Sequence, residues 1–136
     1  MTVLDTSAVV DYLLGAGVAQ QVQELIGAEG ELAAPDVLVF EVLAVLRRES
    51  NRGAIAAERA AGAVGDLGDI SIELFPSLPL RERVWALRAN LTAADALFVA
   101  LAETLEEPLA TKDGPLAREI AKHTAVAVIE LGEDGR

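Results

Sequence analysis

Short apolar segments of strand type alternate along the chain with longer segments in which apolar residues recur at helical spacing. Strands are expected at residues 3–4, 32–34, 70–75, 109–111 and 125–131. Helices are expected at residues 8–13, 19–26, 35–48, 54–67, 80–88, 92–105 and 115–123, with Pro35 at the first position of the third. Strands that alternate with helices pair in parallel and carry helices on both faces. The sequence therefore predicts the α/β class, as a three-layer α/β/α sandwich with a central parallel sheet.

The length of the chain favours a single domain. Its 136 residues contain no repeat, low-complexity tract or linker, so we expect one domain over residues 1–131 and a disordered tail at residues 132–136. Hydrophobic residues make up 52% of the sequence, which is enough for a large core. That richness also indicates that a partner or a second copy covers some apolar surface.

Charge and cysteine content exclude several classes of protein. The net charge is −11, whereas a general nucleic-acid binder has a basic face, so RNA or DNA would bind only with the help of cations and local arginines. The candidates are Arg47, Arg48, Arg52, Arg81 and Arg83, each of which equally fits a solvated helix end. The chain has no cysteine and no apolar run of the roughly 20 residues that span a bilayer, and from its first residues we expect no signal peptide. We therefore expect a cytoplasmic protein without disulfides, thiolate metal sites or a membrane partner.

Three aspartates stand where strands end or helices begin. Asp5 follows the first expected strand, Asp113 follows the fourth, and Asp95 comes three residues after Thr92 at the start of a helix. Each has an ordinary structural explanation, because an aspartate caps a helix or turn well and Thr92 with Asp95 resembles a capping box. The C-terminal ends of parallel strands are also where active sites form in α/β sheets.

Glu41 is the most informative acid, because it interrupts an apolar run over residues 37–46 of the third expected helix. A lone ionised carboxylate is costly to bury, so Glu41 should be paired or bound to a cation. A salt bridge to Arg81 or Arg88, or a place at the solvent-facing margin of the helix, are the alternatives.

The topology allows all four acids to converge at one mouth of the sheet. Carboxylates gathered there repel one another and partly protonate unless a cation neutralises them. Oxygen ligands suit Mg²⁺ or Mn²⁺, which can polarise a phosphoryl oxygen and activate a bound water. The hydroxyl groups of Thr6, Ser7 and Thr111 are placed to support such a site.

The segments around these acids resemble the PIN-domain family. Residues 3–8, Val-Leu-Asp-Thr-Ser-Ala, look like the opening motif of the family, and residues 35–42 are similar to its segment with the glutamate. Residues 91–102 resemble the helix with the third acid, and residues 109–113 resemble the strand end with the fourth. The motifs follow the order of the family over nearly the whole chain. The compact length looks most like the VapC-type toxins of bacterial toxin–antitoxin pairs.

This resemblance implies a Mg²⁺- or Mn²⁺-dependent endoribonuclease, in which an activated water attacks the RNA phosphodiester in line and the 3′-oxygen leaves. It implies that the catalytic metal ligands are Asp5, Glu41, Asp95 and Asp113, with Thr6 or Ser7 in support. A homodimer and a cognate protein antitoxin, whose tail blocks the active site, are implied as well.

Two other function classes remain open on the residues alone. A receiver-like regulatory domain is also small, acidic and Mg²⁺-binding, but it would carry a phosphoacceptor aspartate after the third strand, where residues 75–77, Phe-Pro-Ser, offer none. A catalytically silent PIN-like module would keep the fold only to bind its partner.

Two further residues have mainly structural interpretations. Trp85 is expected in the core or in a dimer contact, with stacking on an RNA base as the alternative. His123 near a helix end is expected to interact with the C-terminal dipole, so a histidine-based acid–base mechanism has little support.

Overall fold

Five parallel strands form the centre of the structure, a computed structural model that describes residues 1–132 of the chain. The strands are β1 (Thr2–Leu4), β2 (Leu32–Pro35), β3 (Ile72–Phe75), β4 (Leu109–Thr111) and β5 (Val128–Glu130). Their order is β3-β2-β1-β4-β5, and every neighbouring pair is parallel. The central strand β1 pairs with β2 on one side and with β4 on the other. The predicted α/β class and parallel sheet are confirmed.

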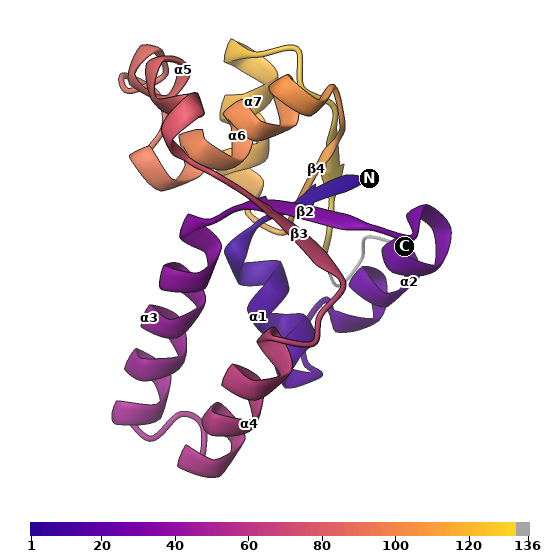
Figure 1. The fold of residues 1–136 in the computed structure, drawn as a ribbon, viewed down its shortest axis with the longest axis vertical. Helices are drawn as coiled ribbons and strands as arrows, with labels where there is room; N and C mark the ends of the chain where they lie inside the picture. The colour runs from indigo at the N-terminus through magenta and orange to yellow at the C-terminus, as the bar shows by residue number, and fades with distance from the viewer. Residues whose placement is uncertain (133–136) are drawn as a thin grey trace.

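Helices cover both faces of this sheet. They are α1 (Thr6–Leu14), α2 (Ala19–Glu29), α3 (Val37–Asn51), α4 (Ala57–Leu67), α5 (Arg81–Ala86), α6 (Ala93–Leu105) and α7 (Gly114–His123), with a 3-10 turn, η1 (Leu78–Leu80), before α5. Figure 1 shows α1 to α4 on one side of the sheet and α5 to α7 on the other, with α3 and α4 extending together away from it. The arrangement is the predicted three-layer sandwich.

The core is built from aliphatic side chains between the sheet and its two helical layers. Val3 and Leu4 of β1 are completely buried, as a central strand covered on both faces requires. On the side of α5 to α7, α6 packs against β1 and β2 and buries Phe98 and Val99. The short strands are therefore held by side-chain packing in addition to their hydrogen bonds.

The prediction that Pro35 opens the third helix is wrong. Pro35 is the last residue of β2 and lies opposite Phe75 of β3, while α3 begins at Val37. The pairing of β2 with β1 ends at Ala33, so the missing N–H of Pro35 breaks no bond to β1. The N–H of Asp36 then donates to the carbonyl of Phe75 at 2.8 Å, which continues the pairing with β3.

The segment around Trp85 also differs from expectation. The helix expected over residues 80–88 is the short α5, preceded by η1. The Trp85 side chain is 67% exposed, so the core position offered for it is wrong. The guanidinium group of Arg88 lies over its ring, 4.5 Å from the ring centre.

Two hydrogen-bonded residues, Leu131 and Gly132, follow the C-terminal strand. The N–H of Gly132 donates to Oε1 of Gln21 at 3.1 Å, and its carbonyl accepts a hydrogen bond from the same side chain. The remainder of the expected tail, residues 133–136, lies outside the described residues. Within residues 1–132, no helix is long and apolar enough to cross a membrane.

We expect Val99→Ala in α6 to lower the free energy of unfolding by about 2 kcal/mol, because it leaves a cavity between helix and sheet. Val64→Ala in α4 is the matched control, since that valine is 45% exposed, and it should change stability by less than about 0.5 kcal/mol. Urea denaturation followed by circular dichroism measures both. Equal losses in the two variants would contradict this description of the core.

Candidate active site

A pocket of about 600 Å³ opens where β1 and β4 end. Asp5 reaches it from the end of β1, Glu41 from α3, Asp95 from α6 and Asp113 from the residues after β4. Thr6 and Ser7 line the same pocket, whereas Thr111 contacts Asp5 from the last position of β4. The structure thus brings together all four acids that the sequence singled out.

Asp5 is the most buried of the four acids, with 7% of its surface exposed. Its Oδ1 accepts the N–H of Ala8 at 3.1 Å and so caps α1, and it also accepts the Ser7 hydroxyl at 3.4 Å. Its Oδ2 accepts the hydroxyl of Thr111. Burial raises the pKa of the Asp5 carboxyl, with a further contribution from Asp95, although the hydrogen bonds of Thr111, Ala8 and Ser7 oppose the rise.

Asp95 stands in the first turn of α6 and lines the same pocket as Asp5. Thr92 caps this helix, because its Oγ1 accepts the Asp95 N–H at 3.1 Å, as the expected capping motif requires. The pKa of the Asp95 carboxyl is raised mainly by its partial burial and also by the charges of Asp113 and Glu41, while a hydrogen bond with Thr92 lowers it. Burial is therefore the main cause of the raised pKa of Asp95, and the repulsion expected among these acids adds to it.

Glu41 is the fifth residue of α3, and its side chain is half-buried at the edge of the pocket. Its Oε1 accepts the Thr6 hydroxyl at 2.5 Å. Arg81 pairs with Glu82, and Arg88 lies over the ring of Trp85. Neither arginine is therefore the salt-bridge partner that the sequence suggested for Glu41. Glu41 therefore lies at the solvent-facing margin of its helix, which was one of the alternatives in the sequence analysis, and α3 is not buried on all sides.

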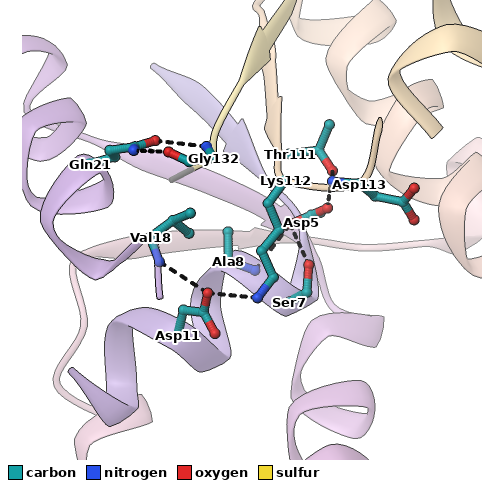
Figure 2. A network of polar contacts seen from close by, with 10 residues as sticks. All are labelled: Asp5, Ser7, Ala8, Asp11, Val18, Gln21, Thr111, Lys112, Asp113 and Gly132. Carbon is teal, nitrogen blue, oxygen red and sulfur yellow. Dashed lines mark hydrogen bonds and ion pairs between the residues drawn. The ribbon is translucent and has the colours of Figure 1, made fainter. Parts of the chain in front are cut away.

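Asp113 is the most exposed of the four acids and caps α7. Its Oδ1 accepts the N–H of Leu116 at 3.0 Å, and its own N–H donates to Oγ1 of Thr111 at 3.0 Å. Thr111 therefore links two acids of the pocket, because its hydroxyl also donates to Asp5. Figure 2 shows this link between the end of β4 and Asp5.

The side chains of the pocket fit a hard divalent cation. They supply carboxylate and hydroxyl oxygens, and neither His123 nor any cysteine lines the pocket. In residues 1–132, no three acidic, histidine or cysteine side chains are arranged to hold one ion together. Mg²⁺ commonly binds through one or two carboxylates and keeps several waters, so this donor set fits such a hydrated ion.

Sequence reasoning missed three charged residues of the pocket, namely Asp11, Glu49 and Lys112. Lys112 and Asp11 both line it, and Nζ of Lys112 lies 2.7 Å from Oδ2 of Asp11. The only available signal was the place of Lys112 between Thr111 and Asp113, which does not say where a long side chain points. His123 lies in the last turn of α7, as expected, and its Nε2 is 3.2 Å from Glu119.

Comparison with known proteins gives consistent matches over most of the chain. A family model described as the PIN domain matches residues 2–122. Ribonuclease VapC9 of Mycobacterium tuberculosis is 39% identical over 113 residues, which cover 83% of this chain and 86% of that protein. Ribonuclease VapC1 of the same organism is 40% identical over 116 residues, covering 85% and 87%. Ribonuclease VapC12, also from this organism, is 35% identical over 136 residues, covering 96% and 98%.

A solved structure supports the fold independently. The crystal structure of PAE2754 from Pyrobaculum aerophilum superposes with a TM-score of 0.70, over 93% of this chain and 81% of that one. The two sequences are 22% identical, so this likeness concerns the fold alone.

We expect Asp5→Asn to raise the melting temperature at neutral pH in the presence of EDTA. The pKa of Asp5 is higher in the folded than in the unfolded protein, where it is about 4. Asp5 therefore lowers the stability of the fold as the pH rises from the unfolded-state pKa through the folded-state pKa. Asparagine keeps the cap and removes the charge. The gain should therefore shrink as the pH falls below about 4. Thermal melts over a pH series measure it, with the exposed Asp66→Asn as the control. A gain that does not depend on pH would contradict this explanation.

Proposed function

Because this chain belongs to the PIN-domain family, we propose that it is a metal-dependent endoribonuclease and the toxin of a toxin–antitoxin pair. It hydrolyses RNA phosphodiester bonds in the cytoplasm with the help of carboxylate-bound Mg²⁺ or Mn²⁺. The relatives that carry the name ribonuclease VapC support this proposal, since they match this chain over most of their own length.

One observation carries the proposal: four carboxylates from distant parts of the sequence line a single pocket. Acids so placed raise one another's pKa, as Asp113 and Glu41 do for Asp95, and this repulsion destabilises the protein unless a cation relieves it. An arrangement that costs stability in this way is typical of functional sites.

The residues that would hold the ion are Asp5, Glu41, Asp95 and Asp113. A bound divalent cation supplies a more acidic water and neutralises charge on the phosphoryl oxygens. The protein's own contribution is orientation: Thr6 fixes the Glu41 carboxylate, and Thr111 with the N–H of Ala8 fixes that of Asp5. Ser7 donates to the same Asp5 oxygen as Ala8 and is the more distant of the two.

The receiver-like alternative has no support in the structure. A phosphoacceptor would follow β3, but β3 is an edge strand that ends at Phe75 and leads through Pro76 into η1. The alternative of a silent partner-binding module is disfavoured by the presence of all four acids in one pocket.

The partners proposed for this protein are RNA, a cognate antitoxin and a second copy of the chain. Large apolar side chains are exposed on α3 and on the η1–α5 segment, namely Val39, Phe40, Leu43, Leu78 and Trp85. The Ser77 hydroxyl bonds to Asp36 at the start of α3, which ties the two segments together. An apolar surface of this kind is typical of a protein interface, and we assign it to the homodimer.

We expect Asp5→Asn and Asp95→Asn each to reduce RNA cleavage more than about 100-fold, which exceeds the usual loss from removing a supporting residue of a metal site. Thr6→Val should lose about 10- to 100-fold, because it only frees Glu41. Activity should require Mg²⁺ or Mn²⁺ and disappear in EDTA. Gel analysis of total RNA measures this, with Asp66→Asn as the control. Undiminished cleavage by either aspartate variant would refute the assignment.

We expect Leu78→Glu combined with Trp85→Glu to convert the dimer into a monomer, because charges placed on the apolar surface oppose its burial. Light scattering coupled to size-exclusion chromatography measures the mass. Val64→Glu on α4 is the control and should leave the dimer intact. A dimer that survives the double substitution would place its interface elsewhere.

A further inference from the structure

The pocket offers few positive charges to an RNA backbone. Its lining includes six carboxylates and two basic side chains, from Asp5, Asp11, Glu41, Glu49, Asp95 and Asp113 and from Arg48 and Lys112. Arg48 is 65% exposed and lies 3.6 Å from Glu49, its neighbour on α3. Lys112 differs from Arg48 because the surrounding pocket fixes both its backbone and its side chain.

The backbone of Lys112 is anchored on both sides by residues of the candidate site. Thr111, the last residue of β4, precedes Lys112, and the Thr111 hydroxyl donates to Asp5. Asp113 follows it, donates its N–H to Oγ1 of Thr111 and caps α7 through Leu116. Lys112 therefore leaves the backbone at a defined place between two of the acids.

The side chain of Lys112 is held by Asp11. Figure 2 shows it extending from the end of β4 to Asp11 on α1, where Nζ and Oδ2 are 2.7 Å apart. Asp11 is fixed in turn, because its Oδ2 accepts the N–H of Val18 at 3.1 Å. Gly17 packs so closely that a Cβ there would lie 2.1 Å from this oxygen. The ammonium group is thus kept at the pocket with a carboxylate as its partner.

We propose that Lys112 binds a phosphate group of the RNA backbone in this pocket, and that Asp11 is the partner of its ammonium group while RNA is absent. The inference rests on the proposed function. The Lys112 side chain is 37% exposed, and an ion pair this accessible to water contributes little stability. Exchanging the carboxylate for a phosphate oxygen therefore costs little, and the new contact is charge-assisted.

Binding of a labelled single-stranded RNA, followed by fluorescence anisotropy in Mn²⁺ over a series of KCl concentrations, tests the proposal. All variants carry Asp95→Asn, so that RNA is not cleaved during the measurement. Lys112→Gln should raise Kd about tenfold and reduce the slope of log Kd against log[KCl] by about 0.7, the value for one phosphate contact on a single strand. Lys112→Arg should retain most of the affinity. Lys122→Gln, the same change on the far end of α7, is the control.

Asp11→Asn separates this role from a structural one. It should lower Kd roughly twofold to fivefold, because Lys112 no longer has to leave a charged partner. In the Lys112→Gln background the same substitution should have a smaller effect, due only to the removed negative charge, and the difference between the two backgrounds isolates the pair. If the ion pair only fastened β4 to α1, Asp11→Asn and Lys112→Gln would instead lower the melting temperature equally and leave Kd unchanged.

Equal Kd values and salt slopes for the parent and Lys112→Gln, or no measurable RNA binding by the parent, would overturn the proposal. Failure of the proposed function is observed separately, as absence of cleavage by the chain that retains Asp95. If the chain that retains Asp95 cleaves RNA but Lys112→Gln leaves binding unchanged, only the role of Lys112 is refuted.

Discussion

The parallel pairing of β1 with β4 positions the acids of the pocket. It places Leu4 opposite Ala110, so that the next residue of one strand, Asp5, meets the end of the other, Thr111. The backbone N–H of Asp5 extends this pairing by donating to Ala110 at 3.3 Å, and the Thr111 hydroxyl then meets the Asp5 carboxylate. A shift of one residue in this pairing would turn Asp5 away from the pocket.

The acids of the pocket are held by groups that also build the fold. Asp5 and Asp113 cap α1 and α7, and Asp95 occupies the first turn of α6 behind the cap Thr92. The positive ends of these helix dipoles favour negative charge, which offsets part of the repulsion among the carboxylates. The structural explanation that the sequence offers for these residues is therefore observed, and it is compatible with the chemical role proposed for them.

Local signals were enough to predict most of the fold. The ends of β1 and β4 and the caps at Asp5, Thr92 and Asp113 depend on neighbouring residues, and these features are observed. Features set by distant contacts could not be predicted. Pro35 extends a strand because of its place beside β3, and no local pattern shows that Trp85 stays exposed.

The site follows the same division between local and distant information. The sequence predicted which acids would gather, because three of them lie at a strand end or a helix start and Glu41 interrupts an apolar helix. It did not predict their separate environments. Burial of Asp5 and exposure of Asp113 depend on what covers each strand end. The direction of Lys112 could not be predicted either, because it is set by Asp11 across the pocket and by the tight turn at Gly17.

The capping role of these aspartates has a consequence for how such a protein can evolve. Asparagine accepts the same helix N–H groups as aspartate, and the codons of the two residues differ by a single base. One point mutation can therefore remove a charge from the pocket without removing the bond that starts α1 or α7. A lineage carrying this fold is one step from a folded descendant that has lost its chemistry and kept its outer surfaces, with those surfaces free to be selected for another purpose.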